Sequence, residues 1–341
     1  MKAILKTKPE RGATVADIPE PERGEEPILK MDAASICGSD VHVYEWSGGY
    51  DGFMNLPLVI GHEGCGRVVY PGASKLKEGQ RILVDPGAAC GECSYCRTGR
   101  DNICPTRKIL GLHRNGLFAE YAAVPAANCI PLPDSIPDEV AASLESLGVA
   151  VRAMENAAPV IGDSAAIVGP GPLGLMSVLL CKMAGLAPVF VFGTRQDEGL
   201  RMDLAEKLGA DGVFYSEDPE SVNAMRKASG GHGVDHVFEW SGSVPGLSMA
   251  CSLAKPGGKV VIGAIYGRNA DLDVTGLVRR EVNLVTVRSR PRGTWLRTLN
   301  MVAGGTVDIT PIIGKSFSLD QAEEAFTLAA EKKMLKGVFR M

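Results

Sequence analysis

The segment AAIVGPGPLGL, residues 165–175, most constrains how this chain can fold. Four residues that favour a strand precede Gly169, Gly171 and Gly174, in the spacing G-x-G-x-x-G, and an apolar stretch that favours a helix follows. Glycines in this pattern allow a tight turn and a close approach of the backbone to a pyrophosphate at the N-terminus of the helix. The turn, which includes Pro172 and Leu173, therefore predicts a dinucleotide site.

The chain around this turn alternates between strands and helices. PVFVFG (188–193), VDHVFEWSG (234–242) and GGKVVIGAI (257–265) favour strands, whereas GLRMDLAEKLGA (199–210) and SVPGLSMACSLAK (243–255) favour helices. This order predicts a doubly wound parallel sheet. The first 150 residues instead contain short strand-like runs between glycines and prolines, which predict an irregular, barrel-like domain. Two domains are also what 341 residues lead us to expect.

The end of the second predicted strand bears on the choice of dinucleotide. An NAD site usually has an acidic residue there, bound to the ribose 2′-hydroxyl, but this chain has Gly193, Thr194 and Arg195. Small residues and an arginine suit a 2′-phosphate, so NADP is favoured. Two alternatives stay open: Arg195 is simply exposed to solvent, or Asp197 is the ribose ligand.

Four cysteines lie in one short loop, CGECSYCRTGRDNIC, as Cys90, Cys93, Cys96 and Cys104. Two-residue spacings let successive thiolates bind one ion, and four thiolates complete a closed tetrahedral zinc site. A closed site has no open position for a substrate, so we expect a structural zinc. Four unligated thiols are the alternative, and an iron–sulfur cluster fits the spacing less well.

A second, incomplete set of ligands is predicted elsewhere in the first domain. Cys37 lies in CGSDVHVY and His62 in GHEGCG, and the third ligand is either Glu63 or Glu145. Three protein ligands and one open position are typical of a catalytic zinc. The alternative for a single cysteine and a single histidine is ordinary core packing.

Charge and composition exclude some classes of function. A net charge of −4 opposes nucleic acid as the main partner, because phosphate binding needs a basic face. The first residues of the sequence show no apolar stretch typical of a secretory leader, and no apolar run approaches the length that a bilayer requires, so we expect no membrane partner and a cytoplasmic location. In that reducing compartment the nine cysteines should be thiols or metal ligands.

The chain as a whole resembles the zinc-dependent medium-chain dehydrogenases, the superfamily of alcohol, sorbitol and threonine dehydrogenases. The resemblance rests on ordered motifs along nearly the entire chain: CGSDVH, GHEGCGRVV, the four-cysteine loop, GLFAEY, ESLGVA, GPGPLG, KPGGKVV and LDQAEEAF. It implies a GroES-like β-barrel catalytic domain, residues 1–150 and 289–341, and a Rossmann domain, residues 151–288. It also implies a homodimer or homotetramer and two zinc ions per chain.

The resemblance assigns roles to individual residues. Cys37 and His62 match the ligands of the catalytic zinc, and Glu145 matches a glutamate that the polyol and threonine branches carry in an E-P-L segment. Glu63 matches a glutamate beside the metal that sometimes binds it. The match departs from the pattern at Ser146, which replaces the proline. Three further residues match positions that assist the metal: Asp40 would orient the zinc-bound histidine, and Ser39 and His42 would form a proton relay.

The implied reaction is hydride transfer between an alcohol or ketone and NAD(P). We expect the secondary alcohol of a polyol, sugar or sugar acid. The alternatives are an L-threonine 3-dehydrogenase-like enzyme, a zinc-independent quinone or enone reductase, and a zinc-ribbon binding module. Candidates for the substrate pocket, with ordinary packing as the alternative for each, are Trp46, Tyr50, Phe118 and Arg288.

Overall fold

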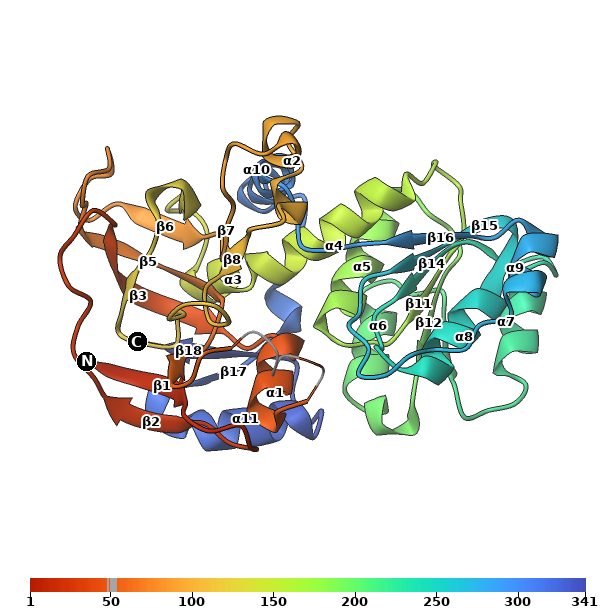
Figure 1. Cartoon of the computed structure of the whole chain (residues 1–341). Coiled ribbons are helices and arrows are strands. Elements are labelled where there is room, and N and C mark those ends of the chain that lie inside the picture. Colours follow the sequence, from red (N-terminus) through yellow and green to blue (C-terminus); the bar gives the residue numbers. More distant parts are fainter. Residues whose placement is uncertain (48, 50–53) are drawn as a thin grey trace. The chain divides into compact units, whose positions relative to one another are not determined.

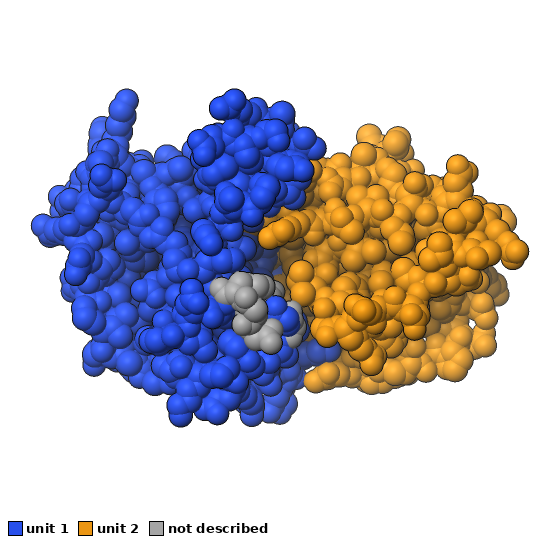
Figure 2. Space-filling model, viewed as in Figure 1, with its two compact units in different colours: residues 1–146, 291–341 blue, residues 147–290 orange. Residues whose placement is uncertain are grey.

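The computed structural model describes residues 1–47, 49 and 54–341. They divide into two compact units, coloured separately in Figure 2. Unit 1 contains Met1–Ser146 and Pro291–Met341, and unit 2 contains Leu147–Arg290. Across the described residues, we find no helix with the length and apolar character to cross a membrane.

Unit 1 is built mainly on antiparallel strands. The largest sheet has the order β10-β6-β5-β3-β18-β17, with β9 also paired to β3, and smaller sheets have the orders β2-β1-β4 and β7-β8. The strands are β1 (Lys2–Lys6), β2 (Thr14–Asp17), β3 (Ile28–Ser35), β4 (Leu58–Val59), β5 (Glu63–Tyr70), β6 (Arg81–Val84), β7 (Gly87–Ala88), β8 (Lys108–Ile109), β9 (Tyr121–Ala123), β10 (Cys129–Pro131), β17 (Ile313–Phe317) and β18 (Lys336–Arg340).

Short helices connect these strands (Figure 1). They are α1 (Gly38–Glu45), α2 (Ser94–Arg97), α3 (Asp138–Ala142), α10 (Arg292–Ala303), α11 (Ala322–Ala330) and the 3₁₀ turns η1 (Asp101–Ile103), η2 (Ala126–Asn128), η4 (Thr310–Ile312) and η5 (Leu319–Gln321). Helix α4 (Leu144–Ala157) begins in unit 1 and continues into unit 2.

The register of three strands brings distant residues together in unit 1. Ser35, the last residue of β3, pairs with Glu63, the first residue of β5, and also with Val338 of β18. In the core of unit 1, Phe118 packs edge-on against Phe339 of β18, with ring centroids 5.0 Å apart. A continuous apolar core thus fixes the ends of β3, β5 and β18 relative to one another.

Unit 2 has one parallel sheet of the order β13-β12-β11-β14-β15-β16, which confirms the predicted doubly wound fold. Its strands are β11 (Ala165–Val168), β12 (Val189–Gly193), β13 (Gly212–Tyr215), β14 (Val234–Glu239), β15 (Ala254–Ile262) and β16 (Asn283–Thr286). Its helices are α5 (Pro172–Met183), α6 (Arg201–Lys207), α7 (Ser221–Ala228), α8 (Val244–Leu253), α9 (Val274–Arg280) and the turn η3 (Arg195–Asp197). Helices α5 and α6 contact each other, as do α7 and α8 (Figure 1).

Candidate metal and cofactor sites

Four potential ligands from three segments of unit 1 meet in one cluster. Cys37 caps the N-terminus of α1, His62 and Glu63 lie at the start of β5, and Glu145 lies in the first turn of α4. One ligand atom from each lies within 4.8 Å of the others. The structure therefore brings together all four residues that the sequence indicates for this site, which we call the cysteine–histidine cluster.

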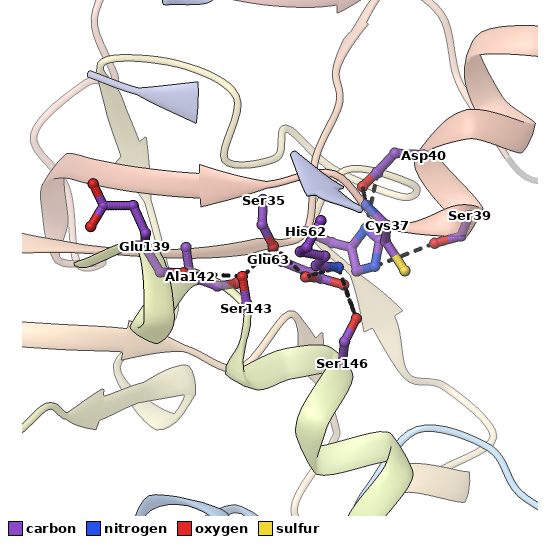
Figure 3. A network of polar contacts seen from close by, with 11 residues as sticks. Ser35, Cys37, Ser39, Asp40, His62, Glu63, Glu139, Ala142, Ser143 and Ser146 are labelled. Carbon is purple, nitrogen blue, oxygen red and sulfur yellow. Dashed lines mark hydrogen bonds and ion pairs between the residues drawn. The ribbon is translucent and has the colours of Figure 1, made fainter. Parts of the chain in front are cut away.

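Asp40 orients both Cys37 and His62. Its Oδ1 lies 3.0 Å from Nδ1 of His62, and its Oδ2 accepts a hydrogen bond of 2.9 Å from the backbone N–H of Cys37 (Figure 3). Burial alone would lower the pKa of His62, but the Asp40 carboxylate raises it well above its usual range. The second ring nitrogen, Nε2, is left for the cluster, in a site whose electrostatics favour a positive charge.

Glu63 is held by side chains rather than left unpaired. Its Oε2 accepts from Ser35 and lies 2.6 Å from Nζ of Lys336, and its Oε1 accepts from Ser146 at 2.8 Å (Figure 3 shows both serines). Burial would raise the pKa of Glu63, but Lys336 and His62 lower it. The sequence interpretation missed Lys336; its one local signal is a lysine directly before an apolar strand segment, GVF.

The two residues of the predicted relay lie on α1. Ser39 Oγ is 3.3 Å from Nε2 of His62, and Nδ1 of His42 is 3.0 Å from Oγ of Ser47. Burial lowers the pKa of His42, so its imidazole is neutral at pH 7 and can accept a proton.

The donor set of the cysteine–histidine cluster fits a zinc ion. A thiolate, an imidazole and a carboxylate are ligands that zinc takes in proteins, and three of them leave a fourth position open. The cluster also offers a second carboxylate, so Glu63 and Glu145 compete for the third place.

The four cysteines of the loop form a second cluster, the four-cysteine cluster. Its Sγ–Sγ distances are 3.5 Å for Cys93–Cys96, 3.6 Å for Cys90–Cys104 and 3.9 Å for Cys90–Cys96. A tetrahedron with Zn–S bonds of about 2.3 Å has edges of about 3.8 Å. These distances therefore match one ion and leave no room for a cluster of several iron atoms.

The thiols of the four-cysteine cluster already differ in acidity. Hydrogen bonds from the backbone N–H of Cys90 and the hydroxyl of Thr106 lower the pKa of Cys104 to about 6. Desolvation and the neighbouring Cys93 raise the pKa of Cys96 to about 12. Sulfur atoms packed this closely resist taking up several negative charges together, which a dication would relieve.

The glycine turn of unit 2 is shaped as the dinucleotide pattern requires. Gly169 has φ of +96°, and a Cβ there would lie 2.7 Å from the backbone nitrogen of Ser241. A Cβ on Gly174 would lie 2.1 Å from the carbonyl oxygen of Gly169. At Gly171, however, a Cβ would meet no atom within 4 Å, so space remains at the N-terminus of α5, where Pro172 begins the helix.

An arginine follows the end of β12, whereas the acidic residue nearby, Asp197, bonds to neighbouring residues of the protein. Cζ of Arg195 lies 3.8 Å from the ring centroid of Tyr215. Asp197 is buried, and its carboxylate accepts from the backbone and hydroxyl of Thr194 at 2.9 and 2.7 Å and from Arg201 at 3.1 Å. The alternative in which Asp197 binds the ribose is therefore disfavoured, because its oxygens are already engaged.

The structure corrects one candidate for the substrate pocket. Phe118 is fully buried and packs against Phe326 and Phe339, so it is a core residue of unit 1. Trp46 is partly buried against the same core, and Arg288 belongs to unit 2. Tyr50 lies outside the described residues.

Unit 1 holds a thiolate–imidazole–carboxylate cluster that suits zinc, and unit 2 has the strand order of a dinucleotide-binding domain. Together these features define the class of zinc-type, nicotinamide-dependent dehydrogenases. Comparison with known proteins agrees. Residues 23–134 match the family described as alcohol dehydrogenase GroES-like domain, and residues 172–304 match the family described as zinc-binding dehydrogenase.

Relatives extend the match to the full chain. L-threonine 3-dehydrogenase from Pyrococcus abyssi is 35% identical over all of this chain and 99% of its own length. A dehydrogenase from Escherichia coli CFT073 (rspB), solved with NADH, has a TM-score of 0.88 at 26% identity. A putative zinc-binding dehydrogenase from Sinorhizobium meliloti 1021, solved with NADP, has a TM-score of 0.88 at 29% identity. Each of these two structural matches covers 100% of this chain and 99% of the chain in the solved structure. The chain belongs to the zinc-dependent medium-chain dehydrogenase family, whose members are NAD(P)-dependent enzymes of the alcohol dehydrogenase type.

Proposed function

We propose that this enzyme oxidises the secondary alcohol of a polyol, sugar or sugar acid, with one catalytic and one structural zinc per chain and with NADP as the preferred cofactor. The observation that carries the proposal is the cysteine–histidine cluster, in which Cys37, His62 and a glutamate meet within 4.8 Å. A quinone or enone reductase needs no such ligands, so this rival is disfavoured.

The roles of the residues follow from their contacts. A zinc ion bound by Cys37, His62 and a glutamate would polarise the substrate oxygen and make its hydroxyl more acidic. Asp40 fixes the ring of His62 so that Nε2 faces the cluster. Ser39 lies beside that nitrogen and is placed to take the hydroxyl proton, and His42, neutral at pH 7, is the base that would receive it.

The cofactor preference rests on the end of β12. Arg195 offers a cation next to the ring of Tyr215, a combination that suits a 2′-phosphate beside an adenine. Gly169, Gly171 and Gly174, with Pro172 and Leu173, would hold the pyrophosphate at the start of α5. We expect Arg195→Ala to raise KM for NADP about 10–100-fold while KM for NAD changes little. An unchanged preference would remove the NADP assignment.

L-Threonine is the second candidate substrate, and the full-length similarity to L-threonine 3-dehydrogenase favours it. Against it stands the strand end Gly193-Thr194-Arg195, where the threonine branch is expected to carry an acidic residue. Both candidates are secondary alcohols, so the same site chemistry serves either.

The deciding experiment measures reduced nicotinamide by absorbance with a panel of polyols, sugar acids, simple secondary alcohols and L-threonine, each with NAD and with NADP. Turnover confined to one class assigns the substrate. Turnover of L-threonine alone would replace the polyol proposal with the second candidate, and silence of the zinc-loaded enzyme across the panel would overturn both.

We also propose that the two units are a catalytic and a nucleotide-binding domain, and that the enzyme is a homodimer or homotetramer, which light scattering coupled to gel filtration would test. We also propose a cytoplasmic location, in which the described cysteines would stay as thiols or metal ligands.

A further inference from the structure

Lys336 is a buried cation far in sequence from the ligands. It is the first residue of β18, and its side chain is only 1% exposed. Its Nζ lies 2.6 Å from Oε2 of Glu63 and donates a 2.8 Å hydrogen bond to Oγ of Ser146. A lysine buried this deeply is costly unless it is paired, so its position indicates a specific task beside the metal site.

Glu63 is enclosed by these partners. Ser35 and Lys336 occupy Oε2, and Ser146 occupies Oε1, so both oxygens already have a donor. Ser146 connects the group, because its hydroxyl donates to Glu63 and accepts from Lys336. Each oxygen has further lone-pair capacity, so these contacts act by fixing the orientation of the carboxylate and by pairing its charge with the ammonium of Lys336. Both effects oppose a move of Glu63 towards a metal ion.

Glu145 and Ser146 are consecutive residues at the start of α4. Successive side chains on a helix point about 100° apart. One turn of helix can therefore direct the Glu145 carboxylate to the cysteine–histidine cluster and the Ser146 hydroxyl to Glu63. The proline of the E-P-L pattern has no hydroxyl to fulfil this second role.

Lys336 also offsets negative charge around the site. A dication, the Lys336 ammonium, the Cys37 thiolate and the carboxylates of Glu63 and Glu145 sum to zero with His62 neutral, and the Asp40 carboxylate beside His62 adds one negative charge. Without the ammonium, the buried Glu63 carboxylate would be the uncompensated charge, and the nearest cation would be the metal.

We propose that Lys336 and Ser146 form a clamp that holds Glu63 off the metal, so that Glu145 is the carboxylate ligand and the fourth position stays open for substrate. Both are positioning residues that act through Glu63. The inference rests on the proposed catalytic metal site. Releasing the clamp converts a four-coordinate site into a five-coordinate one, because Glu63 then binds the metal.

The test replaces the catalytic metal by Co²⁺, whose visible absorption reports its coordination number. In Lys336→Met and Ser146→Ala we expect the absorptivity of the d–d bands to fall about twofold or more as a fifth ligand enters. We expect Co²⁺ affinity to rise about 10-fold in Lys336→Met, because a carboxylate ligand is gained. A merely structural role would weaken the affinity instead. Lys336→Arg should retain the wild-type spectrum.

Matched controls separate the clamp from a general loss of packing. Ser143→Ala removes a buried hydroxyl that donates to the backbone carbonyl of Glu139 in α3. Lys6→Met removes a buried lysine that donates to the backbone carbonyls of Gly12 and Tyr44. Both should leave the cobalt spectrum unchanged. Adding Glu63→Gln to Lys336→Met should restore the four-coordinate spectrum.

Two failures can be told apart. If Cys37→Ser leaves the sulfur-to-cobalt charge-transfer band of the wild-type protein unchanged, the catalytic metal site itself is wrong. If that band disappears as expected, but Lys336→Met and Ser146→Ala keep the wild-type d–d spectrum and affinity, the metal site stands and the clamp is overturned. Loss of cobalt binding in Glu63→Gln with retention in Glu145→Gln would likewise overturn the clamp.

Discussion

The cysteine–histidine cluster and the four-cysteine cluster differ in what supports their ligands. In the first, His62, Glu63 and Glu145 are buried, and side chains from β3, β18 and α1 hold them in place. In the second, Cys90 is exposed and Cys93 and Cys96 are partly exposed. Their hydrogen bonds come from neighbouring backbone N–H groups of the same loop, such as Cys93 to the sulfur of Cys90.

This difference predicts how each site depends on its metal. The cysteine–histidine cluster is attached to strand ends that an apolar core already fixes, so its shape should survive without the ion. The four-cysteine loop contains only the short elements α2 and η1, with little core of its own, so metal binding must supply its folding energy. One cluster should therefore control turnover and the other stability.

The largest effect is expected at the cysteine–histidine cluster. Cys37→Ser should lower kcat/KM about 10³-fold or more, because a thiolate ligand is lost, while the melting temperature changes little. Steady-state kinetics and calorimetry on the same preparation check this. A well-folded Cys37→Ser enzyme with full activity would show that the site assignment is wrong.

The opposite pattern is expected at the four-cysteine cluster. Cys93→Ser should cost about 3 kcal/mol of stability, because one of four thiolates is lost from a closed site that the loop needs in order to fold. The fraction that stays folded should keep its kcat/KM. Zinc content, measured per chain, should fall by one ion relative to wild type. Equal losses of activity in folded Cys93→Ser and Cys37→Ser would erase the distinction between the clusters.

Local spacing explains why the four-cysteine site and the glycine turn could be predicted from the sequence. Cys90 to Cys104 lie in one loop, and Gly169 to Gly174 in one turn, so residues that are neighbours in the chain remain neighbours in space. The parallel sheet was predictable for a related reason, because each strand and helix of unit 2 has its own apolar pattern.

The choice between Glu63 and Glu145 could not be made in this way. It depends on two contacts of Glu63 with residues distant in the chain. Ser35 lies 28 residues before Glu63, and Lys336 of β18 lies 273 residues after it (336 − 63). Register between distant strands is set by the whole core and leaves no local pattern. Asp197 is a different case, because its contacts with Thr194 and Arg201 span only three and four residues, and Thr194 and Asp197 form a local capping box.

A smaller effect is expected from the relay beside the cysteine–histidine cluster. Because burial lowers the pKa of His42 below its usual 6.5, alcohol oxidation should lose activity only as pH falls below that value and the ring becomes protonated. His42→Gln should lower kcat/KM about 10-fold at pH 7 and remove this acidic limb. The pH profile of kcat/KM in both proteins is the measurement. An identical limb in the variant would mean that another group receives the proton.

The smallest effect supplies a baseline for acid stability that involves neither cluster. Acid also protonates metal ligands, so unfolding through metal loss must be separated from unfolding of the protein itself. Asp235 of unit 2 serves this purpose. Burial would raise its pKa, but hydrogen bonds from Lys255 and Ser164 lower it to about 2. A depressed carboxyl pKa stabilises the fold above the unfolded value, near 4, and this stabilisation is lost as pH falls from about 4 to 2.

Asp235→Asn should therefore lower the free energy of unfolding by about 1 kcal/mol at pH 7, a value already reduced for the partial exposure of Lys255. The variant should also show a flatter dependence of stability on pH between 4 and 2. Denaturant unfolding of wild type and variant across that range measures it. Because Asp235 touches neither cluster, zinc content should stay equal in the two proteins at every pH. The opposite outcome is that both proteins unfold together with zinc loss and that their stabilities depend on pH with the same slope. In that case the acid sensitivity would come from the metal clusters, and the contribution assigned to Asp235 would be removed.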